Sequence, residues 1–169
     1  HFAAIGCKNK ALKLLLEFES IKNSIPDLIE HALKYYYEEN DRDALFFFNK
    51  ILELDPYNIE IQAKKGNSLI FLERYEESKI IFENILKIDP SYFEVIFLLA
   101  DSNYYLGNLH EAKKGYENGL KLNPDDEYGL SFLGLTLAEM NDQKGLEYIN
   151  ESLKINPSNS DLIFNKAIA

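Results

Sequence analysis

The sequence predicts an all-α fold, a solenoid of stacked antiparallel helix hairpins. Prolines recur at Pro56, Pro90, Pro124 and Pro157, and this near-constant period falls in the range typical of solenoids. Two columns of small residues keep nearly the same period: Ala32, Gly66, Ala100 and Gly134, and then Ala44, Ser78, Ala112 and Gly145. Between these columns the apolar residues follow the spacing of helices and do not alternate as in strands.

Composition bounds the class of protein. Of the 169 residues, 46% are hydrophobic and 27% are charged, which is typical of a globular chain. The net charge of -10 argues against nucleic-acid binding, which depends on Lys and Arg at phosphates. A single cysteine, Cys7, excludes an internal disulfide framework and fits a reducing, cytoplasmic location. We expect no membrane association, because no apolar run approaches the ~20 residues of a membrane span and no export signal opens the sequence.

Each period is predicted to form two helices. In the second period, Ile61, Gly66 and Leu69 share one face of the first helix, and Phe82 and Ile85 share a face of the second. Small residues on both helices allow close backbone approach, and a bulky column fills the space above the contact: Phe48, Phe82, Tyr116 and Ile149. An Asp-Pro or Asn-Pro pair then ends the second helix, because proline cannot donate a hydrogen bond and restricts the residue before it.

The repeats divide the chain in order. Residues 1–24 are predicted to be an N-terminal helical segment, a degenerate half repeat, because Ala11, Leu15 and Phe18 precede Ala44, Phe48 and Ile51 by about one period. Four full repeats follow at 25–58, 59–92, 93–126 and 127–159. The fourth is one residue shorter, and the missing residue falls between Gly134 and Gly145. Residues 160–169 are predicted to be the first helix of an incomplete fifth repeat. Because the sequence begins at His1 rather than Met and stops within this helix, we expect a piece of a longer protein.

The columns of small, aromatic and proline residues resemble those of the tetratricopeptide repeat (TPR) family from Ile25 to Asn159. Two positions depart from the family pattern: Gln62 replaces an early tryptophan or leucine, and Asn103 replaces an aromatic residue or leucine. The resemblance implies a right-handed superhelix in which the first helix of each repeat lines a concave surface. It also implies a protein-interaction scaffold that is not an enzyme.

The concave face is the predicted binding groove. Helical spacing on the first helices gives ten candidate site residues, most of them apolar: Leu33, Tyr37, Lys64, Asn67, Phe71, Phe97, Asp101, Tyr105, Phe132 and Leu135. We expect these side chains to lie outside the core, because the opposite face of each helix carries it. Exposed apolar strips of this kind mark interaction surfaces. The predicted partner is an apolar peptide or amphipathic helix. For Tyr36, Ile70 and Tyr104, sideways packing between repeats remains an equal alternative.

The best-known ligand mode of the resembling family is a clamp of Lys, Asn and Arg side chains that grips an acidic C-terminus. Lys64 and Asn67 match part of that clamp. The corresponding positions in later repeats are Leu98 and Phe132, which cannot hold a carboxylate. Nearby charges are mainly acidic, namely Glu30, Asp101 and Glu139, and they would repel an anionic terminus. The clamp is therefore disfavoured.

Catalytic and metal chemistry find no support in the sequence. The three histidines, His1, His31 and His110, have no second histidine or cysteine at metal-ligand spacing. No nucleophile is paired with a base, and no glycine-rich phosphate loop follows a strand. We therefore expect no catalytic residue, no metal and no cofactor.

Three function classes remain. The first is an interaction adaptor with a peptide-binding groove. The second is a structural module that self-associates through uncapped ends, because Leu162, Ile163 and Ile168 offer no polar capping face. The third, which the resemblance implies for certain glycosyltransferases, is a substrate-presenting arm of a larger enzyme. The fold alone does not choose among these classes.

Overall fold

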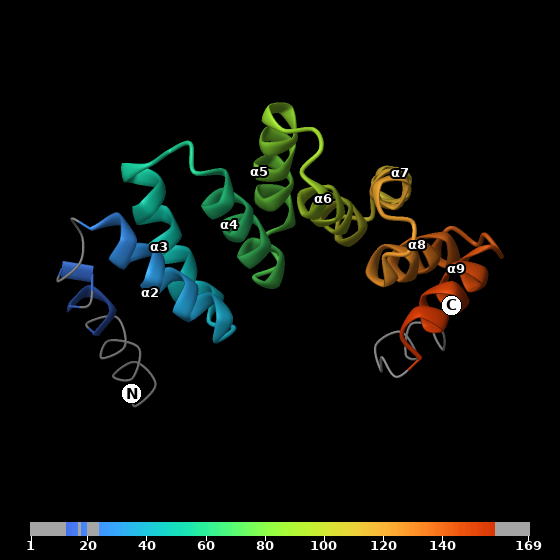
Figure 1. Ribbon diagram of the computed structural model, residues 1–169, viewed down its shortest axis with the longest axis horizontal. Helices are drawn as coiled ribbons and strands as arrows, with labels where there is room; N and C mark the ends of the chain where they lie inside the picture. Colours follow the sequence, from blue (N-terminus) through green and yellow to red (C-terminus); the bar gives the residue numbers. More distant parts are fainter. Residues whose placement is uncertain (1–12, 17, 20–23, 158–169) are drawn as a thin grey trace. The chain divides into compact units, whose positions relative to one another are not determined.

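The computed structural model (Figure 1) describes residues 13–16, 18–19 and 24–157, and their regular secondary structure is α-helical. After helical residues 13–16 and 18–19, the helices are α2 (Ile25–Tyr37), α3 (Asp41–Leu54), α4 (Ile59–Phe71), α5 (Tyr75–Ile88), α6 (Phe93–Tyr105), α7 (Leu109–Leu122), α8 (Glu127–Glu139) and α9 (Gly145–Ile155). The predicted segment 160–169 lies outside the described residues, as does most of 1–24.

The chain forms two compact units, His1–Arg74 and Tyr75–Ala169. Unit 1 contains α2 to α4, and unit 2 contains α5 to α9; within each unit, consecutive helices pack against one another. The division falls between α4 and α5, inside the predicted repeat 59–92. The repeat boundaries therefore remain a prediction.

Unit 1 is built around aromatic and small side chains. Ala32 and Ala44, from the two predicted small columns, are fully buried together with Phe47 and Phe48. The ring of Tyr35 stacks on Phe47 with centroids 5.6 Å apart. The buried residues of α2 are Leu28, Ala32 and Tyr35.

In unit 2 the small columns bring backbones into direct contact. A Cβ atom added to Gly145 would lie 2.6 Å from the carbonyl oxygen of Gly134, and one added to Gly134 would lie 2.7 Å from the carbonyl oxygen of Gly145. Ala100 and Ala112, one repeat earlier, are fully buried beside Tyr116. The small residues therefore set how closely the helices approach.

The first helix of each repeat, which is α2, α4, α6 or α8, ends in the same kind of turn. The residues that follow it have positive φ and recur once per repeat: Glu39 (56°), Glu73 (59°), Gly107 (76°) and Asn141 (58°). At the first of these turns, the amide of Glu39 donates to the carbonyl of Tyr36, and that of Asn40 donates to Tyr35. Equivalent bonds close the other three turns. This is the Schellman arrangement that satisfies carbonyls at a helix end.

The missing residue of the fourth repeat affects the start of α9. Asn141 still follows Gly107 by one full period, so the deletion falls between Asn141 and Gly145. The helices α3, α5 and α7 have 14 residues each, whereas α9 has 11 and begins only at Gly145. One lost residue has therefore removed most of a helical turn.

Candidate binding surfaces

The first candidate surface is a pocket of about 530 Å³ on unit 1, and we call it the unit 1 pocket. It lies beside α2 and α4 and is lined by Tyr36, Tyr37, Glu39, Asp41, Asn67 and Phe71. Three predicted site residues, Tyr37, Asn67 and Phe71, thus come together here. The side chains of Tyr37 and Phe71 are 71% and 68% exposed, so both rings are available to a ligand.

Polar side chains contact Tyr36, one of the residues that line the unit 1 pocket. The amide nitrogen of Asn67 donates to the hydroxyl of Tyr36 at 2.6 Å, and the ammonium of Lys64 lies 5.5 Å from the centroid of the Tyr36 ring. Lys64 also pairs with Glu60 at 3.7 Å. Tyr36 is half-buried and contacts Phe48 at 5.9 Å between centroids. Tyr36 therefore packs within the unit, and the two residues of the predicted partial clamp contact it.

The second candidate surface is a run of rings on unit 2, which we call the unit 2 aromatic face. It consists of Tyr75, Tyr104, Tyr105, Tyr128 and Phe132. Tyr75 stacks on Tyr105 at 5.0 Å between centroids, and Tyr128 meets Phe132 at 4.4 Å. Tyr105 is 46% exposed and Tyr128 is 42% exposed, so the face is open to solvent at both of these rings.

A buried carboxylate lies beneath this face. Asp101 accepts hydrogen bonds from the hydroxyls of Tyr116 at 2.6 Å and Tyr128 at 2.8 Å. Burial raises the pKa of Asp101 from 3.8 to about 6, and the two tyrosine hydrogen bonds oppose that rise. At neutral pH the group is therefore an anion, although desolvation makes that anion costly. Burial and the nearby Asp101 raise the pKa of Tyr105 above its ordinary value.

Tyr104 links the aromatic face to a second carboxylate. Its hydroxyl donates to Glu139, which is exposed at the end of α8. Burial and the contact with Glu139 raise the pKa of Tyr104, so that its hydroxyl stays protonated. Like Tyr36 two repeats earlier, Tyr104 is half-buried and contacts a polar side chain from another first helix.

The expected exposure is wrong for three predicted site residues. Phe97 is 6% exposed, Asp101 is 3% exposed and Leu135 is 7% exposed, and their place in a groove remains a prediction. Phe97 is buried because two glycines make room for its ring: a Cβ atom on Gly129 would lie 2.6 Å from it, and one on Gly119 would also overlap it. Leu33 and Phe132 are half-buried.

The sequence reasoning missed Tyr75 and Tyr128 as members of the aromatic face. Tyr128 lies four residues before Phe132 on α8, so the helical spacing that selected Phe132 could have identified it. Tyr75 is the first residue of a second helix, whereas the predicted groove consists of residues on first helices alone.

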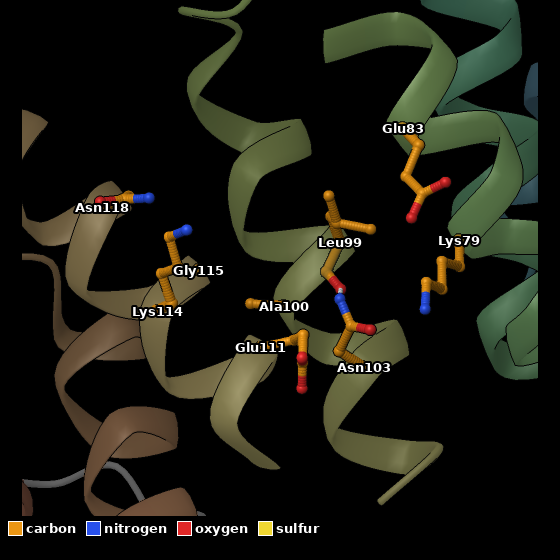
Figure 2. Close-up of a pocket in the computed structure, with 9 residues that line it drawn as sticks. All are labelled: Lys79, Glu83, Leu99, Ala100, Asn103, Glu111, Lys114, Gly115 and Asn118. Carbon is orange, nitrogen blue, oxygen red and sulfur yellow. Dashed lines mark hydrogen bonds between the residues drawn. The ribbon is translucent and has the colours of Figure 1, made fainter. Parts of the chain in front are cut away.

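A further pocket of about 270 Å³ lies elsewhere on unit 2 (Figure 2). It is lined by Leu99, Ala100 and Asn103 of α6 together with Lys79, Glu83, Glu111, Lys114, Gly115 and Asn118 of α5 and α7. The amide of Asn103 donates to the carbonyl of Leu99 at 3.0 Å. Its two lysines and two glutamates give no net charge, and the rings of the aromatic face are not part of it.

Metal-ligating clusters and membrane-spanning helices are both absent from the part of the chain that the structure describes. Within it, no group of three or more His, Cys, Asp or Glu side chains is placed to hold a metal ion. His31 contacts the backbone carbonyl of Asp27 at 2.9 Å through its Nδ1 atom. In the same part of the chain, every helix is too short or too polar to cross a lipid bilayer.

Comparisons with known proteins agree with this geometry. The family model for the tetratricopeptide repeat matches residues 59–92 and 93–126. No curated protein matches the sequence. A MamA structure from Desulfovibrio magneticus RS-1 superposes with a TM-score of 0.76 at 19% identity, covering 94% of this chain and 90% of that one.

Two further solved structures are similar. The thermophilic TPR protein TTC0263 of Thermus thermophilus has a TM-score of 0.75 at 15% identity, covering 85% of this chain and 80% of its own. YrrB, described as a TPR protein with an unusual peptide-binding site, has a TM-score of 0.68 at 22% identity, with coverages of 92% and 80%. At these identities the likeness concerns the fold, and it confirms the predicted all-α solenoid class.

Proposed function

We propose that this chain, in which the tetratricopeptide repeat model matches residues 59–92 and 93–126, is an interaction scaffold that binds an apolar peptide or amphipathic helix on the first helices of its repeats. The TPR fold generally serves protein interaction without catalysis. The proposal goes further, because it assigns a peptide-binding surface to each unit by itself, the unit 1 pocket and the unit 2 aromatic face. The proposed kind of partner follows from the chemistry of those two surfaces.

One observation carries the proposal: the last residue of each of three first helices is an exposed ring. Tyr37, Phe71 and Tyr105 occupy the same position in successive repeats and are 71%, 68% and 46% exposed. Tyrosine and phenylalanine bury large areas at interfaces, and covering one such ring contributes roughly 1.5 to 3 kcal/mol before the cost of association. Two covered rings therefore contribute roughly 3 to 6 kcal/mol, a large part of the ~8 kcal/mol that micromolar affinity corresponds to, and further apolar contacts supply the rest.

The test compares two triple variants of the intact chain in selections from a phage-displayed peptide library. The ring variant carries Tyr37→Ser, Phe71→Ser and Tyr105→Ser. The matched control carries Leu54→Ser, Ile88→Ser and Leu122→Ser, three apolar residues that are 52%, 62% and 56% exposed at the ends of second helices. Because all six side chains are exposed, both variants should keep the helical circular dichroism and melting temperature of the wild type.

We expect peptides rich in apolar residues to bind the wild type and the control with similar Kd. The ring variant should bind them at least about tenfold more weakly, since each lost ring contact removes about 1.4 kcal/mol or more. Equal binding by all three proteins would contradict the proposal. Sedimentation of the wild type gives a second check: a dimer that dissociates only in the ring variant would favour self-association over peptide binding.

A further inference from the structure

The charges on the first helices differ between the two units. In unit 2, the charged residues of α6 and α8 are Glu94, Asp101, Glu127 and Glu139, and neither helix contains a lysine or an arginine. In unit 1, α2 contains Lys34 and α4 contains Lys64 and Lys65. The charged side chains on the first helices of unit 2 are therefore all acidic, and such an arrangement favours cations over anions.

Rings and carboxylates are adjacent on the unit 2 aromatic face. Tyr104 meets Tyr105 edge-on at 5.4 Å between centroids and meets Phe132 at 6.1 Å. Its hydroxyl donates to Glu139, and Asp101 lies beneath, bonded to Tyr128. The negative faces of tyrosine rings attract cations, and a carboxylate at the edge adds a charge-assisted hydrogen bond. The two features act on the same kind of ligand.

Neither carboxylate is neutralised within the described residues. The hydrogen bonds to Asp101 come from the hydroxyls of Tyr116 and Tyr128, and the bond to Glu139 comes from Tyr104. No lysine or arginine of the described residues forms an ion pair with either carboxylate. A buried anion without a counter-ion is costly, and a cation brought by a partner would lower that cost.

We infer that the unit 2 aromatic face binds a basic side chain, the guanidinium of arginine or the ammonium of lysine, carried by an otherwise apolar peptide. The cation lies against the rings of Tyr104 and Tyr105 and pairs with Glu139, while the charge of Asp101 attracts it from below. This inference rests on the proposed function, because the peptide is held there by its apolar residues. An acidic peptide is repelled by the same two carboxylates.

The test uses three blocked, fluorescein-labelled hexapeptides of the pattern Leu-Xaa-Phe-Leu-Xaa-Leu, in which Xaa is Arg, Gln or Glu. Fluorescence anisotropy gives the Kd of each peptide for the intact chain at pH 7. We expect the Arg peptide to bind about tenfold more tightly than the Gln peptide, and the Glu peptide to bind most weakly. This preference should shrink as salt is added, because exposed charges are screened.

Two variants that each remove a carboxylate beside the aromatic face, together with one control, show which charges cause the preference for Arg. Glu139→Gln and Asp101→Asn should each reduce the preference for Arg over Gln to about threefold or less, with the Kd of the Gln peptide unchanged. Glu83→Gln removes the same charge from an exposed site on α5 that belongs to the pocket in Figure 2, and it should leave the preference intact.

The outcomes separate this inference from the proposed function. If the Arg and Gln peptides bind equally well, or if Glu139→Gln and Asp101→Asn both leave the Arg preference unchanged, the inference is overturned and the scaffold proposal stands. If none of the three peptides binds, both are overturned. An Arg preference that is lost in the two face variants and kept in Glu83→Gln supports both.

Discussion

Asp101 connects the stability of the protein to its surface chemistry. The carboxylate is almost fully buried among Tyr116 and Tyr128, yet its two hydrogen bonds do not compensate for the loss of water, because its pKa stays raised at about 6. Folding therefore favours the protonated form. At pH values below the unfolded pKa of about 3.8, a group with a raised pKa makes its full contribution to stability. That contribution is lost as the pH rises through the folded pKa of about 6.

The replacement Asp101→Asn tests this sign. Asparagine keeps the shape and carries no charge, so the free energy of unfolding of the variant relative to wild type should rise between pH 4 and pH 7. The gain follows from the difference between pKa 3.8 and about 6 and is about 2 kcal/mol over this pH interval. Urea denaturation at the two pH values measures it. A variant that becomes relatively less stable at pH 7 would show that the ionised carboxylate is favoured by folding.

At the residue scale, the sequence predicted some exposures and not others. Tyr37, Phe71 and Tyr105 are exposed, and each is the last residue of its helix. Phe97 has the same apolar character and is buried. Its ring fits over Gly119 and Gly129, which belong to two other helices, and the spacing within one helix carries no information about such a contact.

At the scale of elements, the turns after α2 and α4 store strain. Glu73 follows α4 with a φ of 59°, and Glu39 follows α2 with a φ of 56°. This left-handed region costs a residue with a side chain roughly 1 to 2 kcal/mol, and glycine occupies it freely. Gly107 is the one glycine among the four equivalent turns. Glu39 and Glu73 are unfavourable residues for this conformation. The two hydrogen bonds of the Schellman arrangement hold them in it.

We predict that Glu73→Gly raises the free energy of unfolding by about 0.5 to 1 kcal/mol, the steric relief exceeding the added freedom of the unfolded chain. The matched control is Glu83→Gly, an exposed interior position of α5, which should lower stability by about 1 kcal/mol. Thermal and urea unfolding measure both variants. If Glu73→Gly destabilises as much as Glu83→Gly, the positive φ carries no strain.

The elements themselves were largely predictable from the sequence, and their ends less so. The break around Glu73 to Tyr75 and the polar stretch from Met140 to Lys144 mark two of the turns. The left-handed conformation of Glu39 and Glu73 is not visible in the sequence, because that conformation favours glycine or asparagine. The late start of α9 was also not predicted, since the period shows that a residue is missing without showing which helix is shortened.

At the scale of the whole molecule, the period does not reveal the division into units. The repeat continues unbroken through Arg74 and Tyr75, whereas the helices form two compact units that divide at that point of the chain. Each unit has a hydrophobic core of its own. In repeat proteins stability is approximately a sum of local terms and nearest-neighbour contacts, so a core defect in one unit should stay within it.

Gly145→Ala tests this locality. The added Cβ atom would lie 2.6 Å from the carbonyl oxygen of Gly134 and 2.9 Å from the amide nitrogen of Ala138. Both are backbone atoms, so α8 and α9 must separate, at a cost of roughly 1 to 3 kcal/mol. Hydrogen exchange followed by mass spectrometry should show lost protection in α8 and α9 and unchanged protection in α2 to α4. Gln143→Ala, an exposed position in the preceding turn, should change neither, and an equal loss across both units would mean that the chain unfolds as one cooperative body.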